Sequence, residues 1–134
     1  PTGGTGSLTT TAVATGAAAR TLDGLNHELA TRPDLATVVE PLSQEHAVLK
    51  AELLQAARSA LDAGALRTSA ESLRYRANSL ATRLAQAYVC AAKGAGFVSG
   101  HPAEQSLREA MFFQVWSCPP AVTMRTLHEL SGGS

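Results

Sequence analysis

Hydrophobic residues recur at helical spacing along most of the chain, and no segment shows the two-residue alternation of a β-strand. The first periodic segment runs from about Thr11 to Ala30 and stops at Pro33, because proline disfavours the α conformation in the residue before it. Further segments predict helices over residues 43–63, 68–93, 102–115 and 121–130. The predicted fold class is all-α: an antiparallel four-helix bundle with a short fifth C-terminal helix.

Short local signals indicate where the later helices begin and end. Ser43 is a candidate N-cap, and Thr68 with Glu71 matches the capping box that satisfies two amide donors at a helix start. Gly94 suits the position after a helix C-terminus, and Pro102 suits the first turn of the helix that follows. These signals place a loop between the third and fourth helices.

The ends of the chain differ in composition from its middle. Residues 1–10 are rich in Gly, Thr and Ser and predict a flexible linker, because such a segment buries little apolar surface. Residues 131–134 predict a flexible tail. The helical bundle domain is therefore expected over residues 11–130.

The core is expected to depend on small side chains. Hydrophobic residues make up 45% of the chain, yet only 4% of residues are aromatic, so alanine supplies much of the apolar content. Alanine buries little area, and a core made from it requires helices that approach closely. With 134 residues, the chain is long enough for one such core.

Charge and cysteine content exclude several classes of partner. The 11 basic and 11 acidic residues balance, without the basic patch that nucleic acid or an anionic membrane surface requires. No apolar run reaches transmembrane length, and two cysteines do not form a disulfide scaffold, so a cytoplasmic protein with reduced thiols is expected. The four histidines include no Glu-x-x-His pair, so no metal site is predicted.

The segment from Cys90 to Leu130 carries the most specific pattern. Gly96-Phe97 ends a small-residue turn, Pro102 opens a helix containing Arg108-Glu109-Ala110, and Val115-Trp116 follows. This order resembles the C-terminal helical domain of the acyl-CoA dehydrogenase family, with its GGxGY/F turn, RDA helix and IYEGT segment. Residues 16–23 are similar to the family's G-x-x-x-A-x-L-D segment, so the resemblance extends over about residues 11–130.

The resemblance implies a flavoprotein of several domains. In the family, this bundle follows an N-terminal helical domain and a β domain, and FAD lies between the β domain and the bundle. Arg32, Cys90 and Gly94 fall at positions that would face FAD. The implied partners are those two missing domains or further copies in a homo-oligomer, with acyl-CoA as a candidate ligand.

Ser117 falls where the family carries its catalytic glutamate. The family's alternative glutamate position, counted back from Arg32, falls on Gly6. Removing a proton from carbon requires a positioned base such as a carboxylate, and neither residue can act as one. No catalytic residue is therefore predicted in this chain.

Three functional interpretations remain open. The chain is the C-terminal bundle of an acyl-CoA dehydrogenase-like oxidoreductase and contributes FAD-edge and subunit contacts, or it is a free-standing helical interaction or oligomerisation module. In the third interpretation, the chain is part of a flavin-dependent monooxygenase of the same fold, an enzyme that needs no glutamate to remove a proton from carbon. Met111, Phe112, Phe113 and Trp116 cannot all point inward from one helix, which predicts an exposed apolar docking face unless the fifth helix buries them.

Overall fold

All regular secondary structure in the described residues of the computed structural model is helical. These residues are 3–59, 63–93 and 100–133, with side chains described for 8–59, 69–93 and 100–133. The elements are α1 (Gly3–Leu29), the 3-10 helix η1 (Pro33–Leu35), α2 (Ala36–Arg58), α3 (Ala63–Ala92), α4 (Pro102–Phe113) and α5 (Pro120–Leu130). The expectation of an all-α protein is confirmed.

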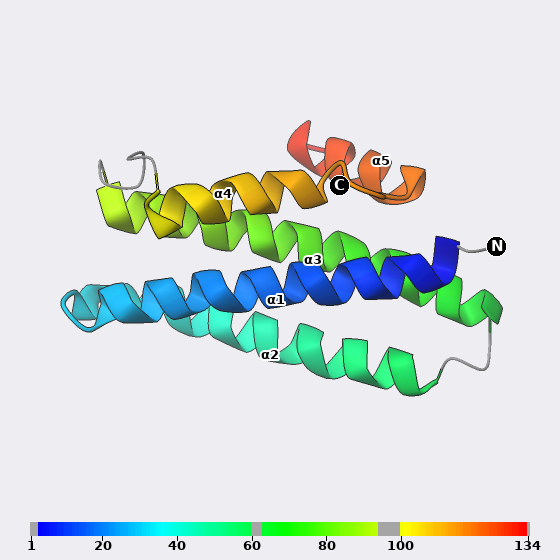
Figure 1. The fold of residues 1–134 in the computed structure, drawn as a ribbon, viewed down its shortest axis with the longest axis horizontal. Helices are drawn as coiled ribbons and strands as arrows, with labels where there is room; N and C mark the ends of the chain where they lie inside the picture. The colour runs from blue at the N-terminus through cyan, green and yellow to red at the C-terminus, as the bar shows by residue number, and fades with distance from the viewer. Residues whose placement is uncertain (1–2, 60–62, 94–99, 134) are drawn as a thin grey trace.

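The helices α1 and α3 form the central pair of the molecule (Figure 1). They run in the same direction, while α2 and α4 run in the opposite direction on the two sides of the pair. Both α2 and α4 pack against α1 and α3, and α5 packs against α3. Residues near the C-terminal ends of α1 and α3 are therefore neighbours.

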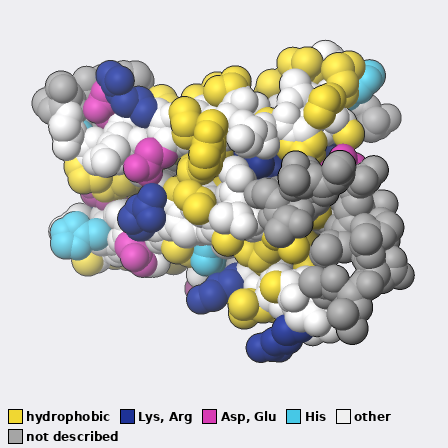
Figure 2. Space-filling model, turned by 45° about the vertical axis from the view of Figure 1, so that its right-hand side comes forward, with side chains coloured by type: hydrophobic (Ala, Val, Ile, Leu, Met, Phe, Trp, Pro, Cys, Tyr) yellow, Lys and Arg dark blue, Asp and Glu magenta, His cyan; other side chains and the backbone are white. Residues whose placement is uncertain are grey.

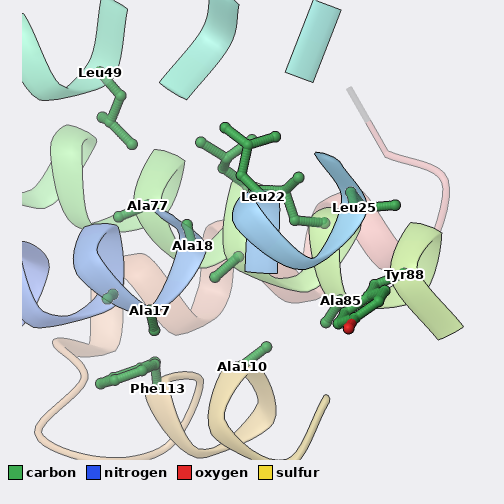
Figure 3. Close-up of a cluster of buried hydrophobic side chains, with 14 of the residues drawn as sticks. Ala17, Ala18, Leu22, Leu25, Leu49, Ala77, Ala85, Tyr88, Ala110 and Phe113 are labelled. Carbon is green, nitrogen blue, oxygen red and sulfur yellow. The ribbon is translucent and has the colours of Figure 1, made fainter. Parts of the chain in front are cut away.

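Small side chains fill the contact between α1 and α3, as the composition predicted. Alanines from both helices are at most 4% exposed, and Leu25, Leu80 and Leu84 are fully buried among them. The alanines of this core cluster are Ala14, Ala17 and Ala18 of α1 with Ala77, Ala81 and Ala85 of α3. Figure 3 shows Phe113 of α4 and Leu49 of α2 reaching this core from different sides.

Gly24 brings α1 close to an aromatic side chain of α3. A Cβ atom at Gly24 would lie 2.6 Å from the Cε2 and Cζ atoms of Tyr88. Only glycine leaves room for the ring at that distance. Tyr88 is consequently 6% exposed near the C-terminal end of the α1–α3 pair.

The attachment of α2 to the central pair is more polar. Only Val39 and Leu49 of α2 are buried. Arg76 of α3 donates two hydrogen bonds to Glu52 at 2.8 and 2.9 Å, and Arg83 binds both carboxylate oxygens of Glu45. Hydrogen bonds from these arginines lower the pKa values of both glutamates from 4.5. Charge pairing therefore complements a small apolar contact.

The N-terminal boundary corrects the prediction of a linker over residues 1–10. The helix α1 begins at Gly3, and Thr10 and Thr11 are 6% and 0% exposed. The Thr15 hydroxyl donates to the Thr11 carbonyl at 2.8 Å, so a threonine-rich helix face is buried with its polar groups satisfied. The composition of this segment led to a wrong prediction because threonine side chains can be buried in a helix face when their hydroxyl groups form hydrogen bonds.

Two helix starts also differ from the sequence prediction. The helix α2 begins at Ala36, with Pro41 inside it, and not at Ser43. Proline gives no N–H to the Thr37 carbonyl, but both residues are exposed and water can bind that carbonyl. The helix α3 begins at Ala63, so Thr68 lies inside it and does not cap its start.

The C-terminal helices agree closely with their predicted ranges. The helix α4 begins at Pro102 as expected and ends at Phe113, and α5 begins at Pro120. Residues 131–133 follow α5 and are exposed. The last helical residue among the described residues is therefore Leu130.

Candidate functional site at the ends of α1 and α3

Arg32 and Cys90, both predicted to face a cofactor, are brought to the same end of the molecule. Arg32 follows α1, and its Nη1 donates to the Ala91 carbonyl of α3 at 3.0 Å. Cys90 is the residue before Ala91, and its side chain is exposed. Gly94, the third predicted residue, lies outside the described residues; the positive φ of 57° that follows α3 belongs to Lys93.

The Arg32 side chain has some capacity to bind an anion. It is 35% exposed, and its Nη2 lies 3.5 Å from Oδ2 of Asp34. An exposed ion pair of this length contributes little, about 0–1 kcal/mol, and can be exchanged for another anion. The guanidinium fork fits a phosphate group. An anion bound at Arg32 would compete with Asp34 for the guanidinium.

Tyr88 and His101 lie beside each other near this end. Their ring centroids are 6.1 Å apart, and His101 Nδ1 accepts a hydrogen bond from the Ala103 amide at 3.0 Å, which caps α4. Burial raises the pKa of Tyr88, and the charge of Glu28 adds to that effect. The phenol of Tyr88 is therefore neutral over the physiological pH range. The capped start of α4 lies at this end of the structure.

A second polar cluster surrounds Arg74, at the turn between α4 and α5. Arg74 is fully buried, and its Nη2 donates to the carbonyls of Phe113 at 2.9 Å and Trp116 at 2.8 Å. Its Nη1 donates to the Ser117 carbonyl at 3.2 Å, and its Nε donates to Asn78 Oδ1 at 3.1 Å. One side chain of α3 therefore holds the C-terminal end of α4 and the turn after it.

Arg74 is held by neutral acceptors. None of the ion pairs within the described part of the chain includes it. Burial lowers its pKa, which the nearby Cys118 partly opposes. The carbonyls at the end of α4 carry the partial negative charge of a helix C-terminus and stabilise the cation.

Ser117 occupies the centre of this turn. Its φ is 47°, a left-handed conformation that is uncommon outside glycine, and its side chain is exposed. The two acidic residues of α4 form ion pairs, Glu104 with Arg108 and Glu109 with Arg20. The turn presents a hydroxyl where the resemblance would place a carboxylate.

Several large apolar side chains of α4 and the turn are exposed. Met111, Phe112, Val115 and Trp116 are 45–77% exposed, whereas Phe113 is buried. The rings of Phe112 and Trp116 stack with centroids 5.4 Å apart. The prediction that these residues could not all point inward is confirmed. Figure 2 shows hydrophobic side chains along the upper part of the molecule, where Figure 1 places α4 and α5.

The remaining features of the described residues are a groove between α2 and α3 and the distribution of metal-ligating and apolar side chains. A groove of about 420 Å³ between α2 and α3 is lined by small polar residues and by the Arg76–Glu52 pair. The described side chains form no group of three or more metal-ligating residues. No helix in the described ranges is long and apolar enough to cross a membrane.

Comparison of the chain with family models, with curated proteins and with solved structures finds no match.

Proposed function

We propose that this chain is the C-terminal helical domain of an acyl-CoA dehydrogenase-like flavoprotein, where it forms one edge of the FAD site and subunit contacts. In this proposal α1 to α4 form the four-helix bundle and α5 closes it. The contact between Arg32 and the Ala91 carbonyl carries the proposal. The acceptor residue Ala91 is next to Cys90, so this contact supports a shared site for two positions that the resemblance assigns to one cofactor.

The proposed role is binding without proton abstraction. FAD, when bound, would supply a hydride acceptor. Arg32 would donate hydrogen bonds to a phosphate oxygen after exchange from Asp34, and Cys90 would contact the cofactor from α3. Ser117 cannot remove a proton from an acyl-CoA because its hydroxyl is not a base at neutral pH. Another domain would have to supply any base for dehydrogenation.

Titration of the purified chain with FAD, followed by flavin fluorescence, tests this proposal. Saturable binding is expected, and Arg32→Ala should weaken it about tenfold or more, because a hydrogen bond to a charged group contributes about 1.5–3 kcal/mol. Arg58→Ala is the matched control, since it removes an exposed cation at the far end of α2. Absence of saturable binding, or equal weakening by both substitutions, would contradict the proposal.

The second candidate is a non-catalytic interaction or oligomerisation module. The exposed apolar residues of α4 and the following turn favour it, because patches of this kind mark protein interfaces. Sedimentation of the wild-type chain and of a Phe112→Ser, Trp116→Ser variant tests it. A homo-oligomer that the double substitution dissociates supports the module, and a wild-type monomer at all concentrations argues against self-association.

A third candidate is part of a flavin-dependent monooxygenase of the same fold. The hydroxyl at Ser117 favours it, since activation of oxygen by reduced flavin needs no base at this turn. Flavin-dependent oxygen consumption by the chain together with its β domain, unchanged in Ser117→Ala, would support this candidate. Acyl-CoA-dependent flavin reduction without oxygen consumption would refute it.

A further inference from the structure

The helix α5 has the smallest apolar attachment of the C-terminal region. Among the described residues, it packs against α3 and no other helix. Val122 is its single buried residue, while Met124, Leu127 and Leu130 are 52–78% exposed. A helix held by so little buried surface is expected to open more readily than the core helices.

The hydrogen bonds donated by Arg74 end before α5 begins. Arg74 binds the carbonyls of Phe113, Trp116 and Ser117, and this set of hydrogen bonds ends at Ser117. After Ser117, the thiol of Cys118 accepts a long contact of 3.8 Å from Asn78 Nδ2. In the described part of the chain, Arg74 therefore donates no hydrogen bond to a residue after Ser117.

Two prolines prevent α5 from continuing the helix of α4. Pro119 has an extended conformation, with φ −60° and ψ 143°, and Pro120 opens α5. Neither residue has an N–H to donate to the preceding turn. Residues 117–120 consequently interrupt the helical backbone, and α4 and α5 are two separate helices.

A cation–π contact joins α5 to α3. The Arg125 guanidinium carbon lies 4.0 Å from the centroid of the Tyr75 ring, a cation–π geometry. The hydrogen bond and charge of Glu45 raise the pKa of Arg83 on α3, and the charges of Tyr75 and then of Glu129 on α5 add to that effect. These contacts orient α5 without enclosing it.

We propose that α5 is a hinged flap that opens from α3 while α1 to α4 stay folded. The segment from Ser117 to Pro120 is the hinge, and the hydrogen bond from Arg74 holds its first residue. The cation–π contact between Arg125 and Tyr75 holds α5 in the closed position. Opening uncovers the Tyr75 face of α3 and the side chain of Val122.

Hydrogen–deuterium exchange on the full chain, resolved by peptide, tests the flap. In the wild-type protein, residues 120–130 should exchange at least tenfold faster than residues 73–88, yet slower than an unstructured peptide. Arg125→Ala should accelerate exchange in α5 about two- to fivefold, the equivalent of one exposed cation–π contact, and leave α1 and α3 unchanged. Arg108→Ala, which removes an exposed cation from α4, should change neither region.

Val122→Ala gives an independent test with a larger expected effect. Loss of the one buried side chain of α5 should accelerate exchange of residues 120–130 about tenfold, again without affecting α3. Equal exchange of α5 and α3 in the wild-type protein would overturn the proposal, because it indicates one cooperative unit. Acceleration of all helices together by either substitution would overturn it for the same reason, as would complete absence of protection in α5.

Discussion

Replacing Arg74 with methionine should lower the free energy of unfolding by about 2–4 kcal/mol. The guanidinium donates to four acceptors, of which the Phe113 carbonyl and Asn78 Oδ1 are in buried hydrogen bonds. Each buried acceptor left without a donor costs about 1–3 kcal/mol. The carbonyls of Trp116 and Ser117 are only partly buried, so water can replace the lost donors there. Removing a buried charge offsets part of the loss.

Urea denaturation followed by circular dichroism measures this change. Arg108→Met is the control: Arg108 is 79% exposed and pairs with Glu104 one helical turn away, so its loss should change stability by less than about 0.5 kcal/mol. Arg74→Lys should destabilise at least as much as Arg74→Met, because an ammonium keeps the buried charge but cannot reach the same acceptors. A loss below about 1 kcal/mol for Arg74→Met would refute the assigned role of this side chain.

Two further predictions concern the contacts of α1 and α2. Gly24→Ala should lower Tm and cost about 1–3 kcal/mol in thermal denaturation, because the added Cβ forces the Tyr88 ring to move; an unchanged Tm would contradict the close contact. The hydrogen bond from Arg83 holds the pKa of Glu45 below 4.5 in the folded state. The contribution of this pair to the free energy of unfolding is therefore present above pH 4.5 and lost as the pH falls through the folded-state pKa. Acid titration of the free energy of unfolding should show this loss, about 0.2–1 kcal/mol, and Arg83→Gln should reduce it, while the charge of Arg76 remains. An identical acid profile in the variant would contradict the pairing.

Sequence periodicity was sufficient to predict the helical class and the later helices. It works for α3 because Leu73, Ala77, Leu80 and Leu84 repeat at the spacing of one helix face, and all four are buried. It failed at the start of α1, where threonines take the place of larger apolar residues. It also placed the start of α2 too late, because a proline near a helix start is compatible with continuation when the affected carbonyl is exposed.

The polar clusters were harder to predict because their partners are distant in the chain. Arg74 interrupts an apolar face, which is a local signal, but its acceptors at the end of α4 are about forty residues away, and they are backbone carbonyls that no side-chain pattern reveals. The pairing of Arg32 with the Ala91 carbonyl is equally non-local. Sequence resemblance suggested that Arg32 and Cys90 share a ligand, but their proximity depends on the parallel packing of α1 and α3.

The most direct test of the proposed cofactor edge is to map where FAD contacts the labelled chain by nuclear magnetic resonance. The proposal predicts that added FAD shifts the amide signals of Arg32, Cys90 and Ala91 together and with one saturation curve. The signals of Glu52 and Arg76, which line the groove between α2 and α3, should stay unchanged. Shifts confined to that groove, or no shifts at millimolar FAD, would contradict the assignment of this end of the α1–α3 pair to a flavin.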